Sequence, residues 1–195
     1  MQNRVMRIPS KSLVCIVLFV VNGYLLLAQQ PSASLPSSVL VHISKIRDNI
    51  TLDGELNDSI WANRSETSNA NNWYGGFVQY YPYDTSQALT QTAFKLAYSD
   101  KYLYIALYCA NRNPKTPFVL NGLKRDFSVT NTDAVVVTLS TYQDGQNGFS
   151  FGLSPYNTQR EGAVENGCGF GVSTSWDQVW FSKTHLYDSC WTAEL

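Results

Sequence analysis

Three of the five tryptophans fall where a ring can serve either as a ligand platform or as part of the packing. Trp73 lies in the polar loop 71–76, and Trp176 lies at a junction of loop and strand. Trp180 comes four residues later and, in a regular strand, would share a face with Trp176. Flat aromatic rings pack on the C–H face of a pyranose, while planar polar side chains orient its hydroxyls. These residue types therefore indicate carbohydrate binding.

Two charged residues complete the candidate set. Arg125 lies in a loop between apolar stretches, where its guanidinium can bind either sugar hydroxyls or an acidic neighbour. Asp177 directly follows Trp176 and would fix hydroxyls beside that ring. Asn157 and Gln159 are expected in a loop, where they face either a ligand or solvent. The predicted carbohydrate site contains no catalytic residue and consists of Trp73, Trp176, Arg125, Asp177 and Trp180.

Acidic residues give a weaker metal hypothesis. Calcium takes about six to eight oxygen ligands in proteins. Asp53 and Glu55 lie close together, and Asp144 lies in a separate loop, but neither segment has the spacing of an EF-hand. The sequence leaves open a structural calcium or solvated acidic turns, and it predicts no other cofactor. With two histidines and no CxxC motif, no zinc site is expected.

The elements that must position these residues are predicted to be strands. A short turn joins the first two strands as a hairpin, and one short helix is expected over 57–63, capped by Asn57 or Asp58. Trp61 and Trp191 alternate with apolar neighbours and are expected in the core. The fold class is therefore all-β, an antiparallel β-sandwich with one short helix. The expected strands are 93–98, 102–109, 134–139, 149–154, 178–185 and 190–195.

The N-terminal segment indicates export. Residues 1–28 begin with three basic residues and no acid, and the apolar run 13–28 is short for a membrane span of roughly 20 residues. We therefore expect a signal peptide cleaved near Ala28. The Pro/Ser-rich segment 29–38 is expected to be a linker, and 39–195 a single domain. The protein would be periplasmic, outer-membrane-associated or extracellular.

Net charge limits the class of binding partner, and the cysteines leave two possibilities for disulfide bonding. Without residues 1–28, 11 of the 14 basic residues remain against 15 acidic ones, a net charge of −4. Nucleic acid is therefore not expected as a partner, because phosphate binding needs a basic face. Of the cysteines, Cys168 and Cys190 can form a disulfide in an oxidising compartment, or they and Cys109 can be buried thiols.

A series of patterns occurs in order along the chain. It comprises ITLDGELND at 50–58 with Ile60-Trp61, LYIA at 103–106, Arg125-Asp126, DAVVV at 133–137, Thr141-Tyr142 with Asp144, NGFSF at 147–151, Ser154-Pro155, Gln159, Trp176-Asp177 and CWTAE at 190–194. In its order and spacing this series resembles the family 9 carbohydrate-binding modules, a branch of the DOMON-like, jelly-roll β-sandwiches. The resemblance covers about residues 43–195.

The resemblance implies a noncatalytic module that binds polysaccharide or oligosaccharide ends by stacking sugars on tryptophans, with structural calcium in some members. Such modules serve carbohydrate catabolism and accompany enzymes that hydrolyse O-glycosyl compounds, or an outer-membrane barrel. The chain departs from the pattern at Ser140, where the family often has an acid. The family pattern also runs on past Leu195, and 190–195 ends without a turn. The domain is therefore expected to be truncated, with a catalytic or barrel domain downstream.

The sequence gives little support to two other function classes, a glycosidase and a haem protein. A glycosidase needs two carboxylates about 5 to 10 Å apart. Glu161 with Glu165, or Asp126 with Asp177, are the candidates, but no spacing marks either pair, so catalysis by this chain is not expected. Some DOMON-like domains hold haem through Met and His, yet the only methionines lie within 1–28.

The remaining alternative is a structural periplasmic domain of an outer-membrane β-barrel protein with no sugar ligand. It predicts that Trp73 and Trp176 are packed rather than exposed.

Overall fold

The computed structural model describes residues 39–47, 50–62, 73–80, 86–168 and 171–195. The expected signal peptide 1–28 and the linker 29–38 lie outside these described residues. Residues Val41–Leu195 form one compact unit. In the described part of the chain, no helix is both long enough and apolar enough to cross a membrane.

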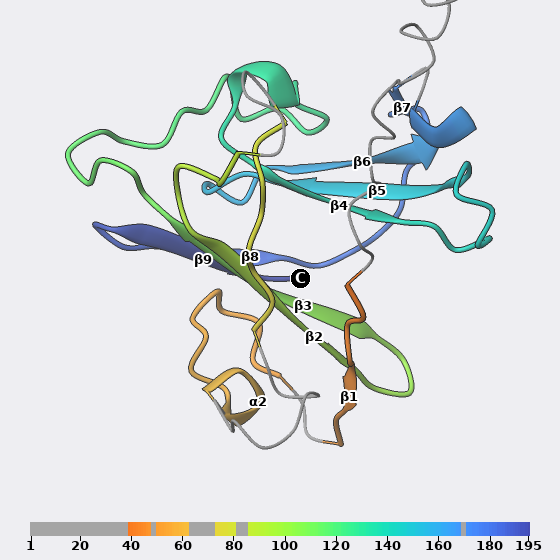
Figure 1. The fold of residues 1–195 in the computed structure, drawn as a ribbon, viewed down its shortest axis with the longest axis horizontal. Helices are drawn as coiled ribbons and strands as arrows, with labels where there is room; N and C mark the ends of the chain where they lie inside the picture. Colours follow the sequence, from red (N-terminus) through yellow and green to blue (C-terminus); the bar gives the residue numbers. More distant parts are fainter. Residues whose placement is uncertain (1–38, 48–49, 63–72, 81–85, 169–170) are drawn as a thin grey trace, which may run out of the picture. The chain divides into compact units, whose positions relative to one another are not determined.

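A five-stranded sheet carries the N-terminal and C-terminal strands together (Figure 1). Only β1 and β2 are parallel, and all other neighbours are antiparallel. β9 lies between β3 and β8 and is therefore not an edge strand. The strand order is β1 (Ser44–Lys45), β2 (Thr92–Tyr98), β3 (Leu103–Ala110), β9 (Cys190–Glu194) and β8 (Lys183–Leu186).

A four-stranded antiparallel sheet faces it (Figure 1). In the described ranges, three short helical segments accompany the sheets: α2 (Ser59–Ala62) and the 3₁₀ turns η2 (Val129–Asn131) and η3 (Asn166–Cys168). The order of the second sheet is β4 (Val135–Leu139), β5 (Gly148–Leu153), β6 (Gln159–Val164) and β7 (Val172–Ser173).

The main core lies between the two sheets. Strand alternation turns Ile105, Leu107 and Cys109 of β3 toward the second sheet, together with Trp191 and Ala193 of β9. Leu153 of β5 meets them from the other side, and partly buried residues of β2 and β4 pack against this group. An all-β sandwich with short helices is therefore confirmed, including the core position of Trp191.

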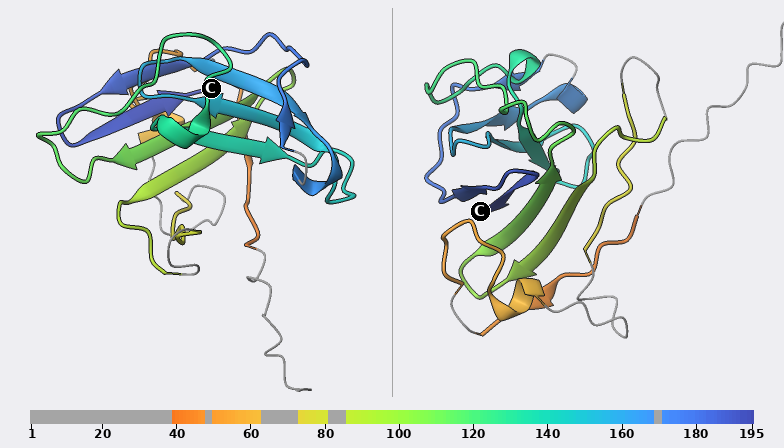
Figure 2. Two further views of the ribbon diagram at one scale, coloured as in Figure 1. Left: turned by 90° about the horizontal axis from the view of Figure 1, so that it is seen from above. Right: turned by 90° about the vertical axis from the view of Figure 1, so that its left-hand side faces the viewer.

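The outer face of the five-stranded sheet, the face turned away from the second sheet, is also covered. Residues 50–62 cross it, and both Figure 1 and the right-hand view of Figure 2 show α2 on this side. Trp61 of α2 is buried against Ala97 and Ala106, whose methyl groups leave space for the indole. The expected core position of Trp61 is thus confirmed, although its core is a second one. The helix is shorter than expected and begins after Asp58, whose backbone oxygen accepts bonds from Trp61 and Ala62.

The expected hairpin is confirmed in β2 and β3, but two strand predictions differ from the structure. The strand expected over 178–185 begins only at Lys183, because the backbone oxygens of Gln178 and Trp180 accept bonds from the side chains of Arg125 and Gln159. Gln159, expected in a loop, is the first residue of β6 (Gln159–Val164), a strand that the sequence pattern did not predict. The polar residues of β6 do not show the apolar alternation that predicts a strand, because its inward face carries the buried Glu161.

Candidate functional site

Trp73 lies over the outer face of the five-stranded sheet. Backbone hydrogen bonds in both directions between Tyr74 and Phe94 of β2, each 2.8 Å, fix its segment beside that strand. The indole packs with the group around Trp61, and its Nε1 donates to the backbone oxygen of Trp61 at 3.3 Å. Trp73 is therefore half-buried and held in place, rather than free in its polar loop.

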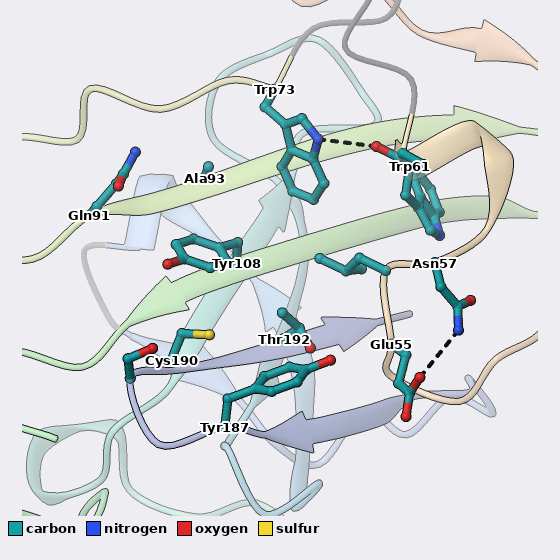
Figure 3. A pocket seen from close by; sticks show the side chains of 13 residues that line it. Glu55, Asn57, Trp61, Trp73, Gln91, Ala93, Tyr108, Tyr187, Cys190 and Thr192 are labelled. Carbon is teal, nitrogen blue, oxygen red and sulfur yellow. Dashed lines mark hydrogen bonds between the residues drawn. The ribbon is translucent and has the colours of Figure 1, made fainter.

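An open cleft of about 1070 Å³ lies beside Trp73 and is called the outer cleft below (Figure 3). Its floor is formed by Ala93, Tyr108 and Thr192, which are in register on β2, β3 and β9. The single methyl of Ala93 leaves room, while Tyr108 presents a ring. Figure 3 shows Trp73 and Tyr187 on opposite sides of Tyr108 in that view. The rings of Trp73, Tyr108 and Tyr187 thus line the open space, together with the buried indole of Trp61.

Polar side chains occupy another edge of the outer cleft. Glu55 lines it with its side chain 44% exposed. Its Oε2 accepts a hydrogen bond from Asn57 Nδ2 at 3.2 Å, and its Oε1 lies 3.3 Å from Nδ1 of His185. His185 in turn packs against the ring of Tyr187 at 4.5 Å between centroids. Glu55 is therefore oriented from two sides while it remains open to solvent.

A buried carboxylate anchors the segment that carries Glu55. Glu194 of β9 is 1% exposed, and its oxygens accept bonds from the backbone N–H groups of Asp53 and Gly54, at 3.0 and 2.9 Å, and from Trp61 Nε1 at 2.7 Å. Burial raises the pKa of Glu194, and these hydrogen bonds oppose that rise only in part. Gly54 has φ +87° and lies against the backbone of Thr184, so a side chain there would be both strained and obstructed.

Arg125 lies at the centre of a second group, on the inward face of the four-stranded sheet. Its Nε donates to Oε1 of Glu161 at 2.7 Å, and the same guanidinium forms an ion pair with that carboxylate. Further bonds reach Gln159 at 3.2 Å and Asp177 at 3.5 Å. The hydrogen bond to Glu161 is the main reason that the pKa of Arg125 is raised. We call Arg125, Gln159, Glu161, Asp177 and Trp180 the Arg125 cluster.

The remaining two tryptophans pack in and beside this cluster. Trp180 donates from Nε1 to Oε2 of Glu161 at 3.0 Å and meets Phe151 edge-on, while also packing against the main core. Trp176 stacks on Phe149 with centroids 4.5 Å apart and touches Phe151 edge-on. Both indoles contact Phe151, although residues 176–180 do not form the regular strand in which their four-residue spacing predicted a shared face. One face of Trp176 is therefore already covered by Phe149.

The five predicted carbohydrate-binding residues thus divide between two places. Arg125, Asp177, Trp176 and Trp180 lie together at the second sheet, whereas Trp73 lies on the outer face of the first. Of the two roles left open for Arg125, the structure shows it holding an acidic neighbour. A smaller hollow of about 320 Å³ adjoins Arg125 on the side of Leu123 and Tyr156.

The calcium candidates are occupied by local hydrogen bonds. Among the described residues, no group of three or more His, Cys, Asp or Glu side chains is arranged to hold a metal ion. Asp53 Oδ1 accepts the backbone N–H of Glu55 at 2.8 Å. Asp144 caps its own turn by accepting from Gln146 and twice from Asn147, which lowers the pKa of Asp144. Asp53 and Glu55 lie in the segment 50–62 over the outer face of the first sheet, whereas Asp144 lies in the turn between β4 and β5 of the second sheet.

The cysteines that the structure describes with side chains are free thiols. Cys109 and Cys190 are both buried and free, so Cys190 forms no disulfide with Cys168, whose side chain lies outside the described part. Burial in the main core raises the pKa of Cys109 to about 12. Cys190 lines the outer cleft and is hydrogen-bonded with Tyr108, whose pKa is raised chiefly by burial.

Sequence reasoning missed three residues that shape these sites. Alternation along 103–109 separates Tyr108 from Leu107 and Cys109, but it gives no sign of a cleft on the face of Tyr108. Glu161 was considered only as a catalytic acid, yet both of its oxygens are engaged by Arg125 and Trp180. Glu194 was quoted only as part of the CWTAE pattern. The signal available for Glu194 was its alternation with Trp191 and Ala193, which turns it away from the main core.

We compared the chain with protein-family models, curated proteins and solved structures, and none of the three comparisons gave a match. The resemblance to family 9 carbohydrate-binding modules therefore stays a prediction.

Proposed function

We propose that this chain is a noncatalytic carbohydrate-binding module and that its sugar lies in the outer cleft. The observation that carries the proposal is the composition of that cleft. The rings of Trp73, Tyr108 and Tyr187 offer flat apolar surface for the C–H faces of pyranoses. Glu55 and Asn57 offer planar polar groups to orient hydroxyls.

The size of the cleft suits a short oligosaccharide. Ligand sites commonly measure about 300–1,000 Å³, and the outer cleft lies at the upper end with an open mouth. An open cleft admits part of a long chain, whereas an enclosed pocket would restrict the ligand to a single sugar. Xylose and glucose polymers both present the stacking faces that this arrangement requires.

Binding is proposed rather than hydrolysis because of the carboxylates. Glycoside hydrolysis ordinarily uses a pair of acids on either side of the scissile bond. Among the described residues that line the outer cleft, Glu55 is the one carboxylate. We accordingly place the chain in an exported system for polysaccharide catabolism, in which a downstream catalytic or outer-membrane barrel domain supplies what binding alone does not.

One observation favours a second candidate, a structural periplasmic domain of an outer-membrane β-barrel protein with no sugar ligand. Trp73 and Trp176 are both half-buried, and each has a packing partner. That is the arrangement the ligand-free alternative predicts. The open space beside Trp73 is what favours binding, because packing alone does not require it.

The test is isothermal titration of the purified chain with xylo- and cello-oligosaccharides. Trp73→Ala should weaken binding by at least about tenfold, since it removes a stacking ring. Trp176→Ala is the matched control, because it removes the same side chain outside the cleft and should leave the affinity unchanged. Both variants are first compared with the wild type by circular dichroism.

The opposite pattern, loss with Trp176→Ala alone, would move the site to the Arg125 cluster. The absence of heat with every sugar, from folded protein, would overturn the binding proposal and favour the structural domain. Release of reducing sugar by the chain alone would overturn its noncatalytic part.

A further inference from the structure

We propose that the outer cleft prefers amino sugars, glycans with a protonated amine at C2, over neutral glycans of the same shape. This inference rests on the proposed function and names the ligand class of the same site. Its basis is the pairing of the rings of Trp73, Tyr108 and Tyr187 with Glu55, the single carboxylate among the described residues that line the cleft. That combination is suited to cations, because a ring face attracts positive charge and a carboxylate neutralises it.

The charge of the cleft is one-sided. Of the described residues that line it, Glu55 alone is charged at neutral pH. The nearest cations by strand register are Lys95 and Lys183, which stand in the row of Glu194, and neither lines the cleft. Lys95 is itself buried. An ammonium group entering the cleft would therefore meet Glu55 before it meets a like charge.

Glu55 is placed for this role by its neighbours. Asn57 Nδ2 donates a hydrogen bond to Oε2 of Glu55, and Nδ1 of His185 lies 3.3 Å from its Oε1, which leaves further lone pairs for a ligand. The carboxylate keeps much of its hydration, so the unliganded protein does not bear the cost of a buried charge. When a ligand covers it, the attraction between carboxylate and ammonium becomes stronger, because water is displaced.

The rings provide the second half of the site. Figure 3 shows Tyr187 with its hydroxyl directed toward Glu55, and Tyr108 deeper on the floor. A pyranose stacked between Trp73 and Tyr187 would present its ring substituents along the cleft, within reach of Glu55. A cation over a tryptophan or tyrosine ring gains about 0.5–2 kcal/mol, depending on how far it is desolvated. Rings and carboxylate therefore act on the same charge.

Three β-1,4-linked ligands isolate the contribution of the amine. Cello-oligosaccharide carries a hydroxyl at C2, the glucosamine oligomer carries an ammonium, and the N-acetylglucosamine oligomer carries a neutral acetamide. We expect the glucosamine oligomer to bind roughly tenfold more tightly than the other two at low salt. The preference should shrink as salt is added, because part of it is a partly exposed charge pair.

Glu55→Gln keeps the shape of the side chain and removes its charge. It should bring the glucosamine oligomer to the affinity of cello-oligosaccharide, with little change for the latter. Glu165→Gln is the matched control, since it removes an exposed carboxylate that does not line the cleft, and it should keep the preference.

Equal binding of all three ligands by the wild type would overturn the amino-sugar inference alone. So would an equal loss for charged and neutral ligands in Glu55→Gln. Failure of every ligand to bind, or binding that Trp73→Ala leaves unchanged, would instead overturn the proposed function. The two failures are thus distinguishable.

Discussion

Two buried glutamates, one on each sheet, occupy comparable positions but are neutralised differently. Glu194 and Glu161 are each 1% exposed, and each accepts a hydrogen bond from a tryptophan Nε1. Glu161 also accepts a hydrogen bond from the guanidinium of Arg125, whereas the three donors to Glu194 among the described residues are all neutral. The same residue type therefore serves as half of an ion pair on one sheet and as a backbone anchor on the other.

The difference teaches how each region is held. In the Arg125 cluster, an ion pair holds Arg125 against β6, and Arg125 in turn contacts the segment that follows β7. The side chain of Arg125 is 45% exposed there. Glu194 ties 53–61 to the sheet through directed bonds to backbone and indole. The outer cleft depends on the hydrogen bonds to Glu194, because Glu55 and Asn57 belong to the segment 53–61. Substitutions that break the Arg125–Glu161 ion pair or the hydrogen bonds to Glu194 therefore separate the contributions of charge and of hydrogen-bond geometry to stability.

The largest effect should come from Arg125→Met. It leaves the carboxylate of Glu161 buried without its cation, and breaking a buried pair in this way typically costs about 3–5 kcal/mol. Because Arg125 is partly exposed and water can enter, we expect the free energy of unfolding to fall by about 3 kcal/mol, measured by urea denaturation.

Arg160→Met is the matched control for this variant, since Arg160 neighbours Glu161 on β6 but points to the other face of the sheet. Adding Glu161→Gln to Arg125→Met should restore part of the loss, because no buried charge then remains. A loss below about 1 kcal/mol in the single variant would show that the ion pair does not hold this region.

A smaller effect is expected from Glu194→Gln. The amide keeps one acceptor oxygen but places an N–H donor opposite either Trp61 or the backbone N–H groups of Asp53 and Gly54. An unpaired buried donor costs about 1–3 kcal/mol, so we expect a loss of about 2 kcal/mol in urea denaturation. Ligand binding in the outer cleft should weaken as well, since the segment with Glu55 loses its anchor. An unchanged stability would contradict the anchoring role.

The two indoles allow the same change to be made at both carboxylates. Trp61→Phe and Trp180→Phe each remove one N–H donor and similar ring area. We expect the free energy of unfolding to fall by about 1.5 kcal/mol in Trp61→Phe, because the described donors that remain to Glu194 are neutral. We expect it to fall by about 0.5 kcal/mol in Trp180→Phe, because the guanidinium of Arg125 still neutralises Glu161. Thermal or urea denaturation of the two variants side by side measures the difference. A reversed order would mean that the indole matters more beside the ion pair.

How far these regions could be predicted from sequence follows from the range of their contacts. Alternation located β2, β3 and β9 and placed Trp191 in the core, because period-two patterns are local. The bond from Trp61 to Glu194 spans 133 residues and the bond from Arg125 to Glu161 spans 36, and no local pattern encodes either. Trp73 and Trp176 both fall at loop positions in the sequence. Only the fold shows that they lie on different sheets, with open space beside Trp73.

The smallest expected effect is a pH dependence that belongs to Glu194. Burial raises its pKa in the folded state above the unfolded value of about 4.3. Between those two pKa values the folded state binds more protons than the unfolded state, so the free energy of unfolding falls as pH rises. The contribution is fully present below the unfolded pKa and is lost as pH passes through the folded pKa.

Glu194→Gln provides the reference for this measurement, because it cannot titrate at that position while every other carboxylate is retained. The stability of the wild type relative to the variant should therefore decline from pH 4 upward and then become constant, in urea denaturation curves recorded across the range. The total decline in this relative stability measures how much less neutral donors stabilise a buried carboxylate than a cation does. A difference that stays constant or grows with pH would mean that the three donors compensate fully for burial. Glu194 would then be held as effectively as Glu161 is by its ion pair.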